Sequence, residues 1–272
     1  MKRAKILSAI LAGTLLLAGC NENTENVPQD SQQSSSSSQS EGSSSSSKAD
    51  STNEDNSSGS ITKVESTEYL IVQNKVAVVV TENGKEASEI EIPYGVTSIG
   101  EYAFQECINL TSVSIPDSTT SIGVESFVGC TSLSSVNIPN SVKFIGGRAF
   151  ADCTSLTNLT ISNSVTEISP NTFNNCTSLT SVTIPDSVDY IGTGAFMDCT
   201  SLSNLTIGNG VTEISDHAFQ GCTSLTNVII PDNVTLIWWY TFDGCEKISA
   251  TYKGNTYDYA HIGDLYKAIN GN

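Results

Sequence analysis

Histidine and positive charge are scarce in this 272-residue chain. It holds two histidines, His217 and His261, and 12 Lys and Arg against 29 Asp and Glu, a formal net charge of −17 at pH 7. No H-E-x-x-H, G-x-S-x-G or phosphate-binding loop motif is present. Phosphate backbones repel so acidic a chain. We therefore expect no enzymatic activity, no cofactor or metal, and no binding to nucleic acid.

A long apolar run is also missing. The run from Ile6 to Gly19 is too short to span a bilayer as a helix. It follows a basic start and ends in Leu17-Ala18-Gly19-Cys20, so residues 1–19 are typical of a secretory signal peptide. The last four residues resemble the bacterial lipobox, in which the cysteine is acylated. We expect Cys20 to anchor the chain to the bacterial cell membrane, exposed at the cell surface, through lipid alone.

Residues 20–60 lack the apolar side chains that a core requires. They are mostly Ser, Gln, Asn, Asp and Glu, with uninterrupted serine runs at 34–38 and 43–47. Such a composition predicts a disordered tether, with a coil reach of roughly 35 Å. A tether of required length and a merely permissive spacer both remain open.

From Ile90 onward the sequence repeats every 23 residues. The columns contain one residue type in nearly every repeat. They are Phe104, Phe127, Phe150, Phe173, Phe196, Phe219 and Phe242; Cys107, Cys130, Cys153, Cys176, Cys199, Cys222 and Cys245; Leu110, Leu133, Leu156, Leu179, Leu202 and Leu225; and Ile92, Ile115, Ile138, Ile161, Ile184, Ile207 and Ile230.

One repeat reads as a strand, a turn and a helical corner. In Leu110–Ile115 the apolar residues alternate as in a strand, and Pro116 ends it because proline lacks an N–H for pairing. Ile122, Phe127 and Cys130 then follow at spacings that suit a short helical or 3₁₀ turn. One coil cannot bury its own apolar side, so the coils must stack with parallel strands. The sequence predicts a mainly β repeat solenoid.

We assign seven coils to residues 90–247 and a cap to each end. Residues 61–89 predict an N-terminal β cap, with strands over 69–80 and a turn at Asn83-Gly84. At the other end the strand columns would fall on Thr251 and Lys253, so the repeat stops there. Residues 248–272 then predict a hairpin over 252–257 and a helix over 262–269.

The repeat Leu-x-x-Val-x-Ile-Pro-x-Ser-Val-x-x-Ile-Gly-x-x-Ala-Phe-x-x-Cys resembles the BspA-like leucine-rich-repeat family of bacterial and protist surface proteins. The resemblance covers about residues 69–272. It implies adhesion to host matrix proteins or other cells, or surface display, with an extracellular protein or a glycan as partner. We expect a monomer. The departures are Ser162 and Gly208 for proline, Thr119 for valine, Ser126, Thr172 and Thr241 for alanine, and Trp238-Trp239 in the last coil.

The seven repeat cysteines admit three interpretations. Stacking brings neighbouring cysteines about 5 Å apart, which would allow disulfides. Seven is an odd number, however, and a buried cysteine behaves as a small apolar residue. Each coil offers one thiol, unlike the close cysteine pairs of zinc sites. We favour a buried column of free thiols over disulfides, and disulfides over metal.

The outward positions of the strands form the candidate binding face. They are small, polar and almost uncharged, without the Tyr, Trp and Arg of interface hot spots. They could serve solubility alone, or a broad multivalent contact. They are Ser112, Ser114, Ser135, Asn137, Asn158, Thr160, Ser181, Thr183, Asn204, Thr206, Asn227 and Ile229.

Trp238, Trp239 and Tyr240 form the one aromatic cluster, beside the predicted C-terminal cap. Packing against that cap is the simpler interpretation. A partner-binding patch is the alternative, because exposed aromatic clusters often anchor interfaces.

Overall fold

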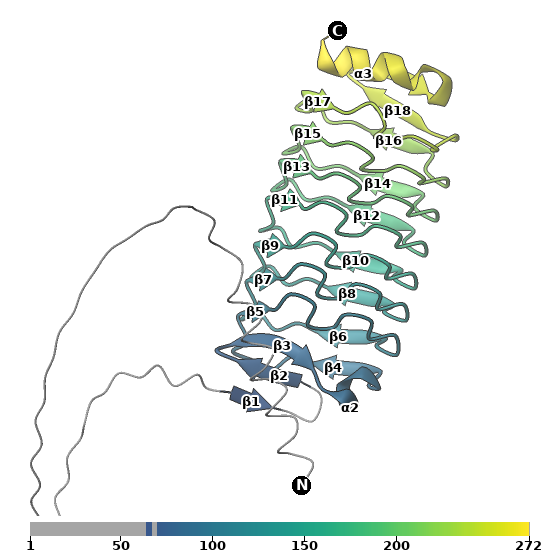
Figure 1. The fold of residues 1–272 in the computed structure, drawn as a ribbon. Helices are drawn as coiled ribbons and strands as arrows, with labels where there is room; N and C mark the ends of the chain where they lie inside the picture. Colours follow the sequence, from purple (N-terminus) through teal and green to yellow (C-terminus); the bar gives the residue numbers. More distant parts are fainter. Residues whose placement is uncertain (1–63, 67–69, 272) are drawn as a thin grey trace, which may run out of the picture. The chain divides into compact units, whose positions relative to one another are not determined.

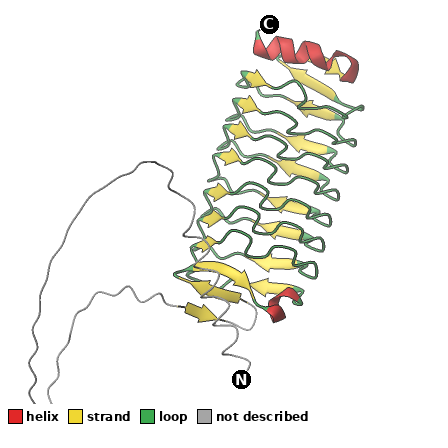
Figure 2. Cartoon of the chain, in the orientation of Figure 1, coloured by secondary structure: helices red, strands yellow, loops and turns green. Residues whose placement is uncertain are grey.

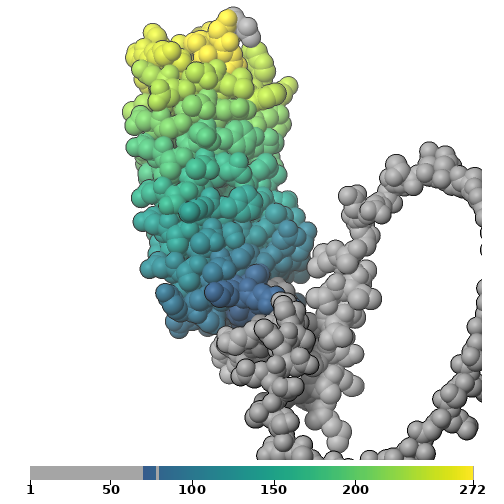
Figure 3. Space-filling view, turned by 90° about the vertical axis from the view of Figure 1, so that its left-hand side faces the viewer, coloured from purple at the N-terminus to yellow at the C-terminus, as the bar shows by residue number. Residues whose placement is uncertain are grey.

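A computed structural model describes residues 64–66 and 70–271 (Figure 1). The predicted signal peptide (1–19), the acylation site Cys20 and the tether (20–60) lie outside the described residues. Between the two caps, the chain winds into coils that stack along one axis (Figure 1). In Figure 3, which looks onto the side of the short strands, the coils follow one another as bands along the stack.

Each coil contributes one long and one short strand, on two sides of the stack (Figure 2). Paired strands run parallel, and typical partners such as Ile99 and Ile122 are 23 residues apart. This confirms the predicted parallel solenoid and its period. The long strands are β4 (Glu89–Glu91), β6 (Ser112–Ser114), β8 (Ser135–Asn137), β10 (Asn158–Thr160), β12 (Ser181–Thr183), β14 (Asn204–Thr206), β16 (Asn227–Ile229) and β18 (Ser249–Tyr252). The short strands are β5 (Ser98–Ile99), β7 (Ser121–Ile122), β9 (Phe144–Ile145), β11 (Glu167–Ile168), β13 (Tyr190–Ile191), β15 (Glu213–Ile214) and β17 (Leu236–Ile237).

The short strands and the corners differ from the expected helical turn. Ile122 lies in a strand, and the corner after it is a chain of turns. Its backbone N–H groups bond alternately within the turn and to the next coil: Ser126 donates to the Gly123 carbonyl, and Phe127 to the Ala149 carbonyl. Every second amide thus connects two coils, which a continuous 3₁₀ helix would not allow. The corner therefore works as a third line of contact between coils.

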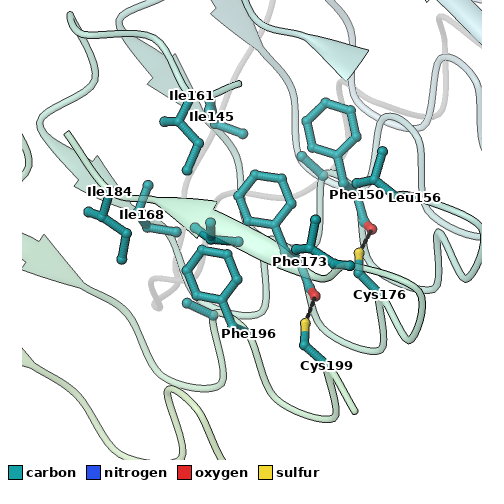
Figure 4. Close-up of a cluster of buried hydrophobic side chains, with 14 of the residues drawn as sticks. Ile145, Phe150, Leu156, Ile161, Ile168, Phe173, Cys176, Ile184, Phe196 and Cys199 are labelled. Atoms are coloured by element: carbon teal, nitrogen blue, oxygen red, sulfur yellow. Dashed lines mark hydrogen bonds between the residues drawn. The ribbon is translucent and has the colours of Figure 1, made fainter. Parts of the chain in front are cut away.

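The core is a set of identical side chains stacked coil upon coil (Figure 4). All seven repeat phenylalanines are fully buried, and neighbouring rings are stacked with centroids 4.7 to 5.6 Å apart. The apolar residue at the centre of the long strands and the isoleucine of the short strands point into the same core. One apolar core therefore runs the length of the stack.

The N-terminal cap is an antiparallel arrangement joined to the short-strand side. Strands β1 (Val64–Ser66), β2 (Leu70–Gln73) and β3 (Val76–Val80) pair in that order, and β3 pairs in parallel with β5. The hairpin turn lies at Asn74-Lys75, where both residues have positive φ. The expectation of a hairpin turn at Asn83-Gly84 was wrong. These residues lie in the short helix α2 (Glu82–Lys85), whose first turn is capped when Gly84 N–H donates to Thr81 Oγ1.

The C-terminal cap begins with an eighth long strand. We expected the repeat columns to stop at Thr251 and Lys253, but β18 pairs with β16 one residue earlier, so Ala250 and Tyr252 occupy the buried columns. One residue is missing between Ile248 and Ser249 relative to the other coils. Beyond it, β19 (Asn255–Asp258) completes the hairpin, and η1 (Tyr259–His261) and α3 (Ile262–Asn270) cover the last coil.

Candidate functional site

The predicted binding face lies on the outward side of the long strands. Its members are exposed, apart from Ser112, which is half-buried, while residues such as Val136 and Val182 between them are buried. The strand pairing beneath the face is interrupted once, because in the described chain no pairing joins β10 to β12, although the two strands remain neighbours. The exposed Ile229 is the one large apolar side chain among the predicted positions. The hydrogen-bonded sheet beneath the predicted surface is thus divided into two parts.

A groove opens at this division. Its volume is about 760 Å³, and Asn137, Thr160 and Thr183 of the predicted face contribute to its wall. Sequence reasoning missed the remainder of the lining, which includes Asp117, Asn140, Ser141, Leu159 and Asn163. The nearest departure from the repeat is Ser162, between Ile161 and Asn163 of the lining, which replaces proline in the fourth coil. The groove offers amide and hydroxyl groups around the half-buried Leu159.

The aromatic cluster is partly packed and partly exposed. Trp238, Trp239 and Tyr240 have exposed fractions of 46%, 53% and 56%. The Trp238 Nε1–H donates to Glu213 Oε1 at 3.3 Å, and the rings of Trp239 and of Tyr266 in the cap meet edge to face, with centroids 5.8 Å apart. Tyr240 stacks on His217 at 5.3 Å. Trp239 thus packs against the cap, Trp238 and Tyr240 contact the preceding coil, and the partner-binding patch stays a prediction.

Two acidic side chains, Glu213 and Asp216, lie beside the aromatic cluster. Glu213 begins β15 and pairs with Leu236, which begins β17, the strand that directly precedes Trp238. Asp216 and His217 are half-buried, and Asp216 Oδ2 lies 3.2 Å from His217 Nε2. Sequence reasoning missed these neighbours, because residues 23 to 25 positions apart meet only through stacking.

The seven repeat cysteines are buried free thiols in the structure. From Cys130 to Cys245, each Sγ–H donates to the carbonyl oxygen of the phenylalanine 26 residues earlier, at 3.1 to 3.3 Å (Figure 4). Burial raises the pKa of Cys153, Cys199 and Cys245 to about 12. These thiols are therefore protonated hydrogen-bond donors of the core.

Two further findings concern the described residues alone. No group of three His, Cys, Asp or Glu side chains is close enough there to hold a metal ion. None of the described helices has the length and apolar character needed to cross a bilayer.

Comparison with known structures identifies several similar bacterial proteins. A leucine rich cell surface protein from Faecalibacterium prausnitzii is 34% identical, with 72% of this chain and 56% of that one covered and a TM-score of 0.64. A leucine rich repeat protein from T. pallidum is 27% identical, with 76% of this chain and 92% of that one covered and a TM-score of 0.63. A leucine-rich repeat protein from Bacteroides ovatus is 28% identical, with 71% of this chain and 51% of that one covered and a TM-score of 0.60. This chain therefore spans only about half the length of the Faecalibacterium and Bacteroides proteins. No curated protein matches it.

A family model gives the assignment directly. The model of the BspA type leucine rich repeat region matches in six copies, over residues 82–200 and 166–260. These ranges cover more than half of the chain and include every long strand from β4 to β18. The chain belongs to the BspA-type leucine-rich-repeat family.

Proposed function

We propose that this protein is a bacterial surface lipoprotein whose solenoid binds an extracellular protein in adhesion to host matrix or to other cells. The observation that carries the proposal is a scaffold of the BspA type that presents rows of exposed polar side chains at a fixed spacing. Neighbouring coils repeat each outward position about every 4.8 Å, so weak contacts can add along the stack. We infer neither catalysis nor a cofactor.

Binding can be tested with residues 20–272 carrying Cys20→Ser, so that no lipid is attached. The protein is immobilised and offered matrix proteins and glycans at low and at physiological salt. We expect a saturable protein ligand whose binding survives physiological salt. Glycan binding alone would replace the adhesion proposal, and silence across the panel would leave a display scaffold.

The proposed anchor is tested separately in a bacterial host. We expect Cys20 to incorporate a labelled fatty acid and the protein to sediment with membranes. Cys20→Ala should abolish labelling and release the protein. Membrane association of this variant would contradict an anchor made of lipid alone.

The groove favours a glycan as the second candidate ligand. Amide and hydroxyl groups from Asn137, Asn140 and Thr160 surround a space large enough for a few sugar units. We would place Asn140→Ala and Asn163→Ala together in the groove and compare glycan binding with that of Asn227→Ala, which alters a different, exposed position. Equal loss in both proteins would exclude the groove.

A further inference from the structure

The exposed aromatic cluster is not required by the repeat. One coil earlier the same three positions hold Ser215, Asp216 and His217, and two coils earlier they hold the small residues 192–194, Gly-Thr-Gly. Those coils form the same strands without Trp or Tyr side chains there. Trp238, Trp239 and Tyr240 nevertheless remain about half exposed. Large apolar surface that folding leaves uncovered is typical of a contact site.

The three rings are already held in place. Glu213 accepts a hydrogen bond from Trp238, the ring of Tyr266 packs edge to face with that of Trp239, and His217 lies flat against Tyr240. A partner would therefore meet rings that have little conformational freedom left to lose. Rigid aromatic anchors of this kind give binding at low entropic cost.

The charge around the cluster specifies the partner. Residues 149–246 contain no Lys or Arg. Their acidic residues are Asp152, Glu167, Asp186, Asp189, Asp198, Glu213, Asp216, Asp232, Asp243 and Glu246. Asp152 pairs with Arg148 and Asp216 with His217, and the structure gives the others no basic partner within ion-pair distance. Of these acids, Glu213, which has no basic partner, and Asp216 lie beside the exposed indole and phenol rings.

We propose that Trp238, Trp239 and Tyr240, with Glu213 and Asp216, form a docking site for an Arg- or Lys-rich segment of a partner protein. This inference rests on the proposed function and names the surface and the partner chemistry. A guanidinium stacks on an aromatic face and donates to a carboxylate at its edge, so one arginine satisfies both features of the site. An acidic or neutral segment would gain the apolar contact alone.

The site carries its own reporter, because Trp238 and Trp239 are the only two tryptophans of the chain. Residues 20–272 with Cys20→Ser are titrated with octa-arginine at physiological salt while tryptophan emission is recorded. We expect a saturable change in emission. Glu213→Gln with Asp216→Asn should weaken binding by about tenfold, the loss of one or two charge-assisted contacts. Glu89→Gln with Glu91→Gln removes the same charge from the exposed β4 and should bind as the parent does.

Three outcomes of the titration would overturn the proposal. They are an unchanged emission, equal weakening in the two charge variants, and a saturable response to neutral cellohexaose in place of octa-arginine. The Trp238→Ala variant tests the same site without disturbing the contact of Trp239 with the cap, and its binding of octa-arginine is measured by calorimetry. Binding as tight as that of the parent would also overturn the proposal.

If a matrix protein found in the panel binds Trp238→Ala as tightly as the parent, the docking site fails while the adhesion proposal stands. If octa-arginine docks but no panel protein binds, the site stands and the adhesion proposal lacks support.

Discussion

The position before each repeat phenylalanine shows how the core of this solenoid accommodates buried hydroxyl groups. The residue before each phenylalanine is alanine in four coils, and Ser126, Thr172 and Thr241 replace it in the others. Thr172 and Thr241 donate to the carbonyl three residues earlier at 2.7 Å. The Ser126 hydroxyl is buried as well but has no hydrogen-bond partner in the described part of the chain. The same site therefore holds two satisfied hydroxyl groups and one unsatisfied group.

Ser126→Ala should stabilise the protein. The substitution removes a buried polar atom without a partner and leaves the side chain that the other coils already accommodate. We expect the free energy of unfolding in urea to rise by about 1 kcal/mol. Thr172→Ala is the matched control, because it deletes a bonded hydroxyl and a methyl group and should lower stability by about 1 to 2 kcal/mol. Destabilisation by Ser126→Ala would mean that this hydroxyl has a partner, such as buried water.

At the scale of elements, the long strands and the core columns followed from the sequence, because residues such as Phe150 and Phe173 repeat at a constant interval. The short strands did not, since two residues carry no detectable alternation. The eighth long strand was missed because a single missing residue before Ser249 moves its columns out of register. The groove and the acidic neighbours of Trp238 depend on how coils stack, which no local pattern encodes.

The thiol column should make stability depend on alkaline pH. Burial raises the pKa of Cys153, Cys199 and Cys245 to about 12, above the ordinary thiol value. Below about pH 8.5 both the folded and unfolded chains keep these protons, so the thiols add no pH dependence. As the pH rises toward 12, the unfolded chain loses protons first, and each thiol should lower the free energy of unfolding by about 1.4 kcal/mol per pH unit.

Urea unfolding of Cys20→Ser between pH 8 and pH 10.5 measures this slope. Adding Cys153→Ala should reduce the pH dependence of the free energy of unfolding by the contribution of one thiol. The difference between the two proteins therefore measures the cysteine alone and not the other titrating groups. A thiol reagent at pH 8 should find no reactive cysteine in the folded protein and seven after unfolding without reductant. Fewer than seven would indicate disulfides instead.

The C-terminal cap ends the stack by imitating the next coil. In the inner corners, the N–H of each phenylalanine donates to a carbonyl one coil further on. After the last corner, Phe242 N–H donates instead to the hydroxyl of Tyr266 at 3.2 Å, and Gly244 N–H to that of Tyr259. Asn270 takes the place of a further strand beside β17, because its side-chain amide accepts from the Ile237 N–H and donates to the Ile237 carbonyl. The helix α3 therefore protects an edge that would otherwise be open.

Tyr266→Phe tests this imitation. The change leaves the ring in the core but removes the acceptor for the buried Phe242 amide, so we expect a loss of about 1 to 3 kcal/mol in the free energy of unfolding. Tyr94→Phe, at a side chain that is 88% exposed, should change it little. Equal stability of the two variants would show that solvent reaches the Phe242 amide.

At the scale of the whole solenoid, the stack has one internal boundary. Neither β9 and β11 nor β10 and β12 are paired in the described chain, although Phe150 and Phe173 remain stacked across the boundary. Ser169 occupies a column that is glycine in most coils, where a Cβ on Gly146 or Gly192 would lie within 2.9 Å of the preceding backbone. The Ser169 hydroxyl donates to the Ile145 carbonyl at 2.7 Å, in place of the backbone N–H that Gly146 and Gly192 use. Ser215 in the same column keeps its backbone bond, so the boundary belongs to the fourth coil.

Hydrogen exchange should detect this boundary. In a repeat protein the stability of a coil depends on its interfaces with its neighbours, so a weakened interface lowers protection locally. The amides of Thr166 and Ser169 lack the inter-coil carbonyl partners that those of Asp189 and Gly192 have one coil later. We expect the former pair to exchange at least about tenfold faster, which corresponds to about 1.4 kcal/mol of local stability. Ser169→Gly should restore the close approach of the two coils and slow exchange at Thr166, whereas Ser215→Gly should leave Thr166 unchanged. Uniform protection across the fourth coil would mean that the shared phenylalanine core, rather than sheet pairing, sets the cooperativity of the solenoid.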